Sequence, residues 1–208
     1  MKTILINGSP RKNWNTAQLL HSAQKGAEST GGKTIYYDLY DLNFTGCRSC
    51  LACKRKGNPS PCKCVWKDEL SPVLEQIYGA DRLILGSPIY YGEPAGMVRC
   101  LMERLCFPAM TYNDYTSVFD GKVDVDIFLT MNVTKERYAS MYGQKFEAYF
   151  WPMHFLNGQT RLHPFYDTLQ VQDYSKYEMA SFDGDHKHAM RETQFPLDLE
   201  CAYQIGAE

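Results

Sequence analysis

Two short apolar runs, each closed by Gly-Ser-Pro, constrain the fold more than any other feature of this sequence. Residues 2–7 read KTILIN and residues 81–88 read DRLILGSP; Gly-Ser-Pro follows the first run and ends the second. Continuous apolar runs of this length are typical of strands that are buried on both faces of a parallel sheet. We therefore expect a parallel α/β sheet in which these two strands end in similar turns.

Segments with strand-like and helix-like periodicity alternate along the rest of the chain. Further strands are expected at 33–39, 123–131 and, more weakly, 167–172, and helices at 16–30, 67–79, 93–105, 135–158 and from Phe195 onward. Such alternation implies parallel pairing with right-handed crossovers. The pattern predicts a single α/β domain over residues 1–208: a flavodoxin-like three-layer αβα sandwich with a five-stranded parallel sheet in the order 2-1-3-4-5.

The charge and the apolar patterning exclude several classes of protein. The net charge is −2, and the lysines and arginines are scattered, so there is no basic stripe for nucleic acid or an anionic membrane. No apolar run approaches the length of a membrane span, and the N-terminus does not resemble a signal peptide. We therefore expect a cytoplasmic protein with no nucleic-acid or membrane partner, whose eight cysteines stay reduced.

The turn after the first strand, INGSPRKNWNT, has the composition of an anion site. Ser9, Asn15 and Thr16 offer short polar side chains, Arg11 adds a fixed charge, and a helix begins at about Asn15. The turn lacks both the P-loop pattern and G-x-G-x-x-G, which argues against a nucleoside triphosphatase and an ordinary dinucleotide fold. A phosphate monoester fits this chemistry, and a capped turn without a ligand is the alternative.

The turn after the third strand, LGSPIYYGEP, suits a flat ligand. Pro88 and Gly92 restrict the backbone, and Ile89, Tyr90 and Tyr91 supply apolar and aromatic surface for a planar heterocycle. In the expected strand order, this turn and the first one line the same crevice at the carboxyl edge of the sheet. A tyrosine-rich surface loop is the alternative.

Together these motifs resemble a known family. The combination of GSPRKNWNT, C-x2-C-x2-C, KDEL, ADRLILGSPIYYGEPAG and LMERL is similar to the flavodoxin-like NAD(P)H-dependent FMN reductases, in particular the iron–sulfur flavoprotein branch. The resemblance covers residues 1–131. It implies FMN-contacting residues in both turns, namely Ser9, Arg11, Asn15, Thr16, Ala17, Pro88, Ile89, Tyr90, Tyr91 and Gly92. A third contact loop is expected at 131–133, and Trp14 departs from the glycine common in the family.

The resemblance also implies the activity. NAD(P)H would pass hydride to N5 of FMN, and the reduced flavin would reduce a flavin, a quinone, a nitroaromatic or a redox protein. No side chain is assigned as catalytic, because this transfer requires no acid or base. A homodimer or larger homo-oligomer is expected. Two alternatives are an iron–sulfur flavoprotein that acts only as an electron carrier, and a non-enzymatic interaction module stapled by zinc.

The cysteine loop, residues 46–64, holds five cysteines. Cys47, Cys50 and Cys53 have the C-x2-C-x2-C spacing that can ligate a [4Fe–4S] cluster, with Cys64 or Cys62 as the fourth ligand. A zinc site and free or redox-active thiols are the alternatives.

Other polar and cysteine residues are expected to have structural roles. We expect Cys100, Cys106 and Cys201 to be buried packing residues. The sequence DGDHKH (183–188) is interpreted as a solvated loop, and Glu103-Arg104 as solvated charge on a helix.

Overall fold

The computed structural model describes residues 1–58, 60 and 62–208, and its strands form one mainly parallel sheet. The strand order is β2-β1-β3-β5-β6, and β4 pairs antiparallel with the end of β3. The strands are β1 Lys2–Asn7, β2 Lys33–Asp38, β3 Arg82–Tyr90, β4 Glu93–Pro94, β5 Val123–Thr130 and β6 Asn157–Phe165. The predicted flavodoxin-like sandwich and its order of five parallel strands are therefore confirmed, with β4 as a short addition.

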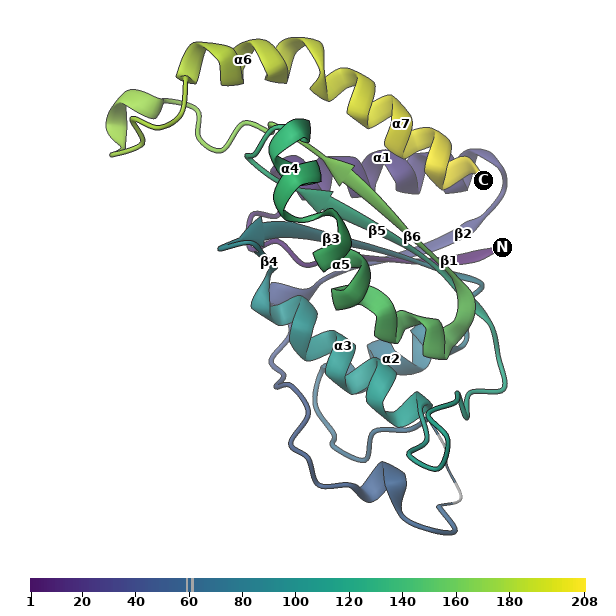
Figure 1. The fold of residues 1–208 in the computed structure, drawn as a ribbon. Coiled ribbons are helices and arrows are strands. Elements are labelled where there is room, and N and C mark those ends of the chain that lie inside the picture. Colours follow the sequence, from purple (N-terminus) through teal and green to yellow (C-terminus); the bar gives the residue numbers. More distant parts are fainter. Residues whose placement is uncertain (59, 61) are drawn as a thin grey trace.

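Helices cover both faces of the sheet. In Figure 1, α1, α6 and α7 lie above the sheet, and α2, α3 and α5 lie below it. The α-helices are α1 Asn15–Ser29, α2 Leu70–Tyr78, α3 Gly96–Ala109, α4 Lys135–Met141, α5 Gly143–Phe150, α6 Gly184–Thr193 and α7 Phe195–Ala207. Short 3₁₀ helices are η1 Leu39–Asp41, η2 Ala52–Lys54, η3 Trp151–Leu156 and η4 Tyr174–Lys176. Within the described ranges, none of these helices combines the length and the apolar character needed to cross a bilayer.

The core is divided between the two faces because successive strand side chains point to opposite sides. Leu5 and Phe128 pack with α1 and α7, whereas Ile127, the neighbour of Phe128, packs on the side of α2, α3 and α5. Helices α1 and α7 approach closely at Gly206, where a Cβ atom would lie 1.9 Å from the Ala23 carbonyl oxygen. The last helix is thereby held against α1, whose N-terminus lies at the carboxyl edge of the sheet.

The fifth parallel strand is β6, so the prediction of a strand at 167–172 was wrong. The predicted long helix at 135–158 is divided into α4, α5 and η3, and it ends at Asn157, whose φ is 62°. Among the described strands, β6 pairs with β5 alone, and an edge strand tolerates polar residues and a proline such as Pro164. Residues 167–172 instead follow β6 and lie beyond its carboxyl end.

A buried carboxylate ties β6 to the sheet interior. Asp126 of β5 is fully buried and accepts hydrogen bonds from Arg82 Nε at 2.6 Å, Arg161 Nε at 2.8 Å and His163 Nε2 at 2.7 Å. Burial alone would raise the pKa of Asp126, but the hydrogen bonds from His163 and Arg161 and the charge of Arg82 hold it well below its usual range. This cluster joins three parallel strands side by side.

Candidate functional site

The phosphate turn, residues 8–14 between β1 and α1, is held by backbone and short polar groups. The Gly8 N–H donates to the Gly86 carbonyl oxygen of β3 at 2.8 Å. The Ser9 N–H donates to Asn7 Oδ1 at 3.0 Å, and the Arg11 N–H donates to Ser9 Oγ at 3.1 Å. These bonds join the turn to two strands and fix Ser9, which is buried, at the carboxyl edge of the sheet.

The first turn of α1 begins beside this turn with its backbone donors unpaired. Trp14 occupies the N-cap position, and its side chain makes no capping hydrogen bond. Across the described ranges, the N–H groups of Asn15, Thr16 and Ala17 donate to no acceptor, as first-turn groups do when no cap is present. An anion here would gain these donors and the positive end of the helix dipole.

One pocket at the carboxyl edge, called the flavin pocket below, brings together most of the residues predicted to contact FMN. Its lining includes Ser9, Arg11, Asn15, Thr16, Pro88, Ile89 and Tyr90 from the two predicted turns. Ala17, Tyr91 and Gly92, which were also predicted, are not part of this lining. Arg11 supplies a positive charge, and none of the described lining residues carries a carboxylate.

The second turn is a tight β-hairpin formed by β3 and β4. Tyr90 pairs with Glu93, and the two residues between them, Tyr91 and Gly92, have φ of 51° and 72°. Positive φ at both central positions is the signature of a type I′ turn. The Ser87 hydroxyl holds the base of the hairpin. It donates to the Pro88 carbonyl oxygen and accepts from the backbone N–H of Ala95, which follows β4. Tyr91 is therefore directed into solvent, fully exposed, at the tip.

The third wall follows β5, close to where the sequence predicted it. Thr130, Met131 and Asn132 line the flavin pocket, whereas Val133 does not. Thr130 Oγ1 lies 2.7 Å from Thr16 Oγ1, which joins this wall to α1. Asn132 Oδ1 is buried and accepts no hydrogen bond from any described residue, so it is an acceptor available to a ligand.

Sequence reasoning missed a fourth wall, the covering segment at residues 168–172. The Leu169 carbonyl oxygen accepts from Trp14 Nε1 at 3.0 Å and from Asn15 Nδ2 at 2.8 Å, and the Gln170 carbonyl oxygen accepts from the Arg11 guanidinium. The segment thus pairs with side chains of the phosphate turn and of α1. The covering segment was missed because residues 167–172 were predicted to be a strand, and a strand would have used these carbonyl oxygens in the sheet.

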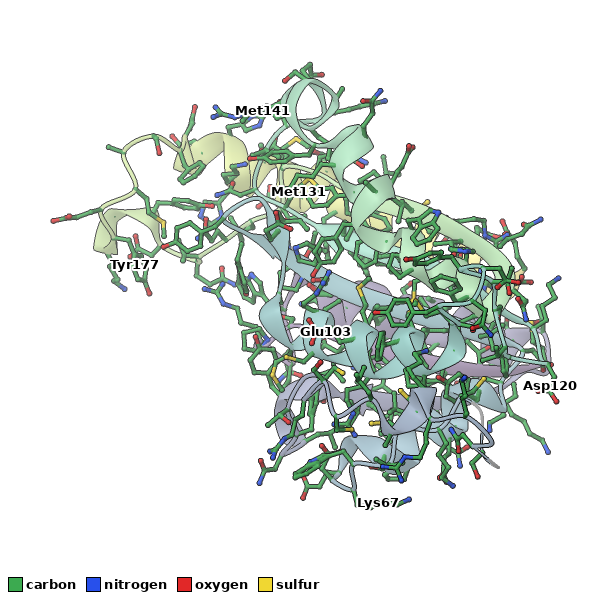
Figure 2. The ribbon with its side chains drawn as sticks, turned by 60° about the horizontal axis from the view of Figure 1, so that its bottom comes forward. Lys67, Glu103, Asp120, Met131, Met141 and Tyr177 are labelled. Atoms are coloured by element: carbon green, nitrogen blue, oxygen red, sulfur yellow. The ribbon has the colours of Figure 1, made fainter. Side chains whose placement is uncertain are left out.

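A buried ion pair anchors the covering segment. Asp167, at 6% exposure, pairs with Lys187, at 4% exposure, and with His186 Nε2 at 2.6 Å. The Lys187 ammonium also donates to the Asn132 carbonyl oxygen at 2.6 Å. Burial would raise the pKa of Asp167, but the hydrogen bonds from Lys187 and His186 lower it overall. Figure 2 shows Tyr177 at the outer end of the segment that leads to α6, away from Met131.

This anchor corrects the interpretation of DGDHKH as a solvated loop. Asp183 is the N-cap of α6, and its side chain accepts from the His186 N–H at 3.1 Å. Residues 184–188 are the first turns of that helix, and Lys187 points inward. Helix α6 reaches α1 as well, since Arg191 donates to Asn15 Oδ1 at 2.9 Å and thereby orients the Asn15 amide.

The residues of the flavin pocket fit an FMN in their chemistry. The phosphate would replace the missing cap of α1, and buried Ser9 and Thr16 with Arg11 add donors around it. The unpaired Asn132 Oδ1 offers an acceptor for an N–H at the edge of a planar ring. Pro88 and Ile89 supply the flat apolar surface between these polar ends.

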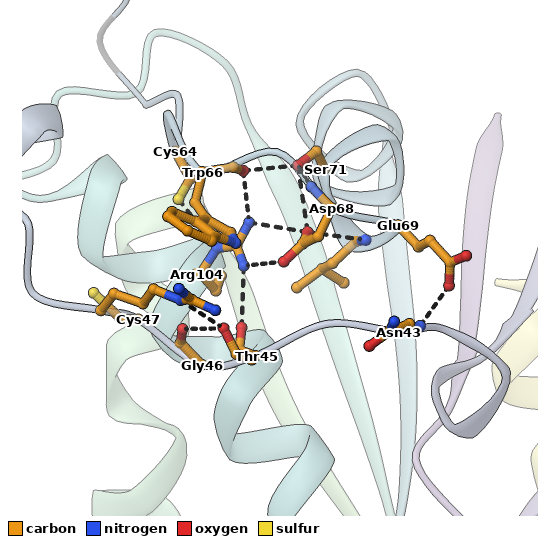
Figure 3. A network of polar contacts seen from close by, with 12 residues as sticks. Asn43, Thr45, Gly46, Cys47, Cys64, Trp66, Asp68, Glu69, Ser71 and Arg104 are labelled. Carbon is orange, nitrogen blue, oxygen red and sulfur yellow. Dashed lines mark hydrogen bonds and ion pairs between the residues drawn. The ribbon is translucent and has the colours of Figure 1, made fainter.

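The cysteine loop lies away from this pocket, against the outer side of α2 and α3 (Figure 1). Arg104 of α3 holds both of its ends, as Figure 3 shows. Its guanidinium donates to the Thr45 carbonyl at 3.0 Å, to the Trp66 carbonyl at 3.0 Å and to Cys64 Sγ at 3.0 Å. It also pairs with Asp68 at 2.7 Å. Arg104 is 1% exposed, so the interpretation of Glu103-Arg104 as solvated charge was wrong for Arg104.

Two further contacts fix the middle of the loop to α3. Glu103 Oε2 accepts from the Cys47 N–H at 3.2 Å. The Lys54 ammonium donates to the carbonyl oxygens of Phe107 and Met110 at the C-terminal end of α3, and it lies 4.4 Å from the centroid of the Phe107 ring. A cation at this position interacts favourably with the helix dipole. For the part of the loop that the structure describes, each hydrogen bond to α3 therefore involves a side chain.

Four of the five loop cysteines share one small pocket. Cys47, Cys50, Cys53 and Cys64 line it together, whereas Cys62 lines only a second cavity, between α2 and residues 118–120, to which Cys64 also contributes. All eight cysteines are free thiols, and the described residues contain no group of three or more Cys, His, Asp or Glu arranged to hold a metal. The thiols that share the small pocket are nevertheless the kind of side chain that ligates a metal through sulfur.

The remaining cysteines do not share one environment. Cys106 is buried as predicted, Cys100 is half-buried, and Cys201 is exposed, so the prediction of a packing role was wrong for Cys201.

Proteins similar to this chain carry flavin-related names. An iron–sulfur flavoprotein from Methanocaldococcus jannaschii is 36% identical over 104 residues, which are 50% of this chain and 51% of that protein. An iron–sulfur flavoprotein from Archaeoglobus fulgidus is also 36% identical, over 50% of this chain and 48% of that protein. The chain thus spans about half the length of the curated relatives it matches.

Solved structures with the same fold cover the whole chain at low identity. An NAD(P)H:quinone oxidoreductase from Methanothermobacter marburgensis has a TM-score of 0.74 at 13% identity, over 100% of this chain and 98% of that one. An FMN-dependent NADH-azoreductase from Bacillus anthracis, solved with FMN, has a TM-score of 0.65 at 13% identity, over 100% of both chains.

The family comparison covers the part of the chain that builds the phosphate turn and the hairpin. The model of a family described as NADPH-dependent FMN reductase matches residues 1–129, more than half of the 208 residues. This range includes both turns of the flavin pocket and the cysteine loop. The chain therefore belongs to the NADPH-dependent FMN reductase family.

Proposed function

We propose that this protein is an FMN-dependent NAD(P)H oxidoreductase. The observation that carries the proposal is the flavin pocket, in which an uncapped helix N-terminus and buried polar side chains face a rigid apolar hairpin. A bound FMN supplies the redox chemistry, namely hydride transfer from the nicotinamide to N5 and onward reduction of an acceptor. Family membership and the flavin-dependent names of the structural neighbours support this assignment.

The protein's own part is to bind and orient the cofactor. Ser9, Arg11, Asn15 and Thr16 are proposed to bind the phosphate together with Ala17; Asn15 and Ala17 would do so through their backbone N–H groups, because Leu169 and Arg191 already hold the Asn15 amide. Their positions at the start of α1 support this role, because phosphate groups are stabilised at helix N-termini. The hydrogen bond from Gly8 to β3 keeps these donors in place before the cofactor arrives.

The hairpin is proposed to hold the flavin ring. Pro88, Ile89 and Tyr90 line the pocket and would contact the ring. Tyr91 and Gly92 lie just outside the lining, and their backbone is proposed to cover the ring's edge. The covering segment is proposed to shield the phosphate end from water, because it lies against Trp14 and Asn15, whose side chains donate to the Leu169 carbonyl oxygen. No side chain is assigned a proton-transfer role.

The acceptor is proposed to be a small molecule or a redox protein. The structural neighbours include enzymes named as quinone and azo reductases, which supports a small-molecule acceptor. The predicted homo-oligomer, the cytoplasmic location and the single domain over residues 1–208 stay predictions.

The visible spectrum of the purified protein tests the cofactor. We expect flavin absorption, and anaerobic bleaching of that absorption by NADPH or NADH. A colourless protein that takes up no added FMN would overturn the proposal. A yellow protein that neither NADPH nor NADH bleaches would favour the electron-carrier alternative, and a colourless protein with bound zinc would favour the interaction module.

We further propose that the cysteine loop holds a [4Fe–4S] cluster, with Cys64 rather than Cys62 as the fourth ligand. The observation that favours it is the shared pocket, which Cys64 lines with Cys47, Cys50 and Cys53 and which Cys62 does not line. The Arg104 guanidinium and the Ser49 N–H donate to Cys64 and Cys47 sulfur atoms, as donors to cluster-ligating thiolates do. The iron–sulfur flavoprotein names of the relatives support the proposal.

Iron and sulfide analysis of anaerobically purified protein tests the cluster. Cys64→Ser should lose most of the bound iron, and the matched variant Cys62→Ser should retain it. Equal retention in both variants would show that Cys64 is not a ligand, and absence of iron and sulfide from the wild type would remove the cluster altogether.

A further inference from the structure

A second cavity adjoins the flavin pocket on the outer side of the phosphate turn. It has a volume of about 460 Å³, and it lies between residues 11–14 and the segment 170–177, which includes η4. Arg11, Trp14 and Gln170 line both this cavity and the flavin pocket, so the two are neighbours across one shared wall. The family match ends at residue 129, so one whole side of the cavity comes from the chain beyond that match.

The cavity carries an excess of positive charge. Arg11, Lys12 and Lys176 line it, against one carboxylate, Asp173. Lys12 pairs with Asp41 and Lys176 pairs with Asp173 at 3.2 Å, but all four side chains are between 44% and 74% exposed. Exposed ion pairs of this kind contribute little, so both ammonium groups are available to a ligand with a stronger negative charge. The described residues offer Arg11 no carboxylate partner.

Two aromatic side chains also line the cavity. Trp14 is held in place by its Nε1–H, which donates to the Leu169 carbonyl oxygen at 3.0 Å. Tyr177 is 55% exposed at the outer end of the segment. Aromatic surface beside cations suits a ligand that combines a planar base with phosphate, because the base stacks while the phosphate pairs. The amides of Asn13, Gln170 and Gln172 add hydrogen-bonding groups for the edge of a base.

We propose that this second cavity binds the 2′-phosphoadenosine end of NADPH, and that Lys12 and Lys176 set a preference for NADPH over NADH. The inference rests on the proposed function, which requires a reduced nicotinamide dinucleotide at the neighbouring flavin. A dinucleotide could span both pockets across their shared wall, with its nicotinamide over the flavin ring. NADH lacks the 2′-phosphate and would leave the two lysines without a new partner.

Direct binding tests the cavity without relying on turnover. Adenosine 2′,5′-bisphosphate is titrated into the full-length protein, and tryptophan fluorescence is followed together with isothermal calorimetry. We expect saturable binding, weakened at least about tenfold in a Lys12→Gln/Lys176→Gln double variant, because hydrogen bonds to charged groups are lost. The control Lys25→Gln removes an exposed lysine on α1 and should bind as the wild type does.

Two ligand controls identify what the cavity recognises. Adenosine 5′-monophosphate should bind at least about tenfold more weakly than the bisphosphate, and inorganic phosphate alone should not compete at equal concentration. Equal binding of the two adenosine nucleotides, effective competition by phosphate, or equal affinities in the double variant and the control would each overturn the proposal.

Steady-state kinetics of the FMN-loaded protein test the preference. The double variant should lose at least about tenfold in the ratio of kcat/KM for NADPH over NADH, through a higher KM for NADPH. An unchanged ratio would overturn the inference even if both nucleotides are oxidised. If neither nucleotide is oxidised, the proposed function fails, and the binding titrations alone decide whether the cavity takes 2′-phosphoadenosine.

Discussion

The phosphate turn and the cysteine loop are both irregular segments that follow strands of the parallel sheet, but different contacts hold them. The phosphate turn is fixed by backbone hydrogen bonds to β1, β3 and its own short side chains. The cysteine loop is fixed by long side chains that cross from or to α3, above all Arg104. The phosphate turn lies between a strand end and a helix start, so it takes its shape once the sheet forms. The cysteine loop takes its shape through particular charged side chains.

The largest expected effect follows from removing the anchor of the loop. Arg104→Met should destabilise the protein by about 3–5 kcal/mol, because Asp68 would keep a partly buried charge without its cationic partner. Urea unfolding followed by circular dichroism measures this free energy. FMN affinity should change by less than about twofold, since the flavin pocket has separate contacts.

The matched control lies on the same helix. Arg99→Met removes an exposed i,i+4 ion pair with Glu103 and should cost less than about 1 kcal/mol. If the two variants were equally stable, or if Arg104→Met abolished FMN binding in a folded protein, the two segments would not be independent.

A second substitution tests whether backbone hydrogen bonds alone hold the flavin pocket. Asp167→Asn should cost about 3 kcal/mol at neutral pH, because Lys187 would remain buried with its charge uncompensated. FMN affinity should fall with it, since Asp167 anchors the covering segment. Chemical unfolding and FMN titration measure both effects. Asp185→Asn, at an exposed position in α6, is the control and should change neither by a measurable amount.

The same carboxylate predicts a pH dependence. The pKa of Asp167 is lower in the folded state than in the unfolded chain, so the pair stabilises the protein fully above about pH 4, the range of an ordinary aspartate. This contribution is lost as the pH falls through the lower folded value. The stability difference between wild type and Asp167→Asn should therefore stay constant from neutral pH to about pH 4 and shrink as the pH falls further; a difference that stays constant in acid would contradict the assignment.

A smaller effect is expected at the hairpin. Gly92→Ala should cost about 1–2 kcal/mol, because φ is 72° there and a Cβ atom would lie 3.0 Å from the Tyr142 ring. Thermal unfolding measures the change. The control Gly96→Ala, where a Cβ atom meets nothing within 4 Å, should be neutral or stabilising by up to about 1 kcal/mol. The opposite order would mean that backbone conformation does not determine this turn.

The smallest effect should come from an exposed side-chain contact of the same hairpin. Lys145→Ala removes an ion pair with Glu93 in which both side chains are more than 40% exposed. We expect a loss of less than about 0.5 kcal/mol in the unfolding free energy. A loss above about 1 kcal/mol would show that this hairpin also depends on side-chain anchors.

The features that sequence reasoning predicted are those that local patterns encode. Strands β1 and β3 contain continuous apolar runs, β5 ends in one, and Ser9 and Thr16 stand at fixed offsets from the end of β1. Strand β6 has no such run, because it is an edge strand whose Arg161 and His163 donate hydrogen bonds to the buried Asp126. Its polar residues made the weaker pattern at 167–172 look like the fifth strand.

The features that were missed depend on partners far apart in the sequence. Arg104 looks like an ordinary helix-surface arginine until the fold places Asp68 and Thr45 beside it. Lys187 sits in a polar run and becomes buried only because Asp167 faces it. A single sequence carries no local sign of either pairing, since both pairs form only after the sheet and its helices have assembled.

The way Arg104 holds both ends of the cysteine loop has a consequence for conformational entropy. Closing a flexible segment of about 20 residues costs roughly 2.5 kcal/mol in lost chain freedom. The hydrogen bonds that Arg104 donates to Thr45 at one end, and to Cys64 and Trp66 at the other, offset this entropy cost during folding. A metal or an oxidant that joins the loop's thiols would therefore act on a segment that is already closed. None of its binding free energy would be needed to bring the two ends of the loop together.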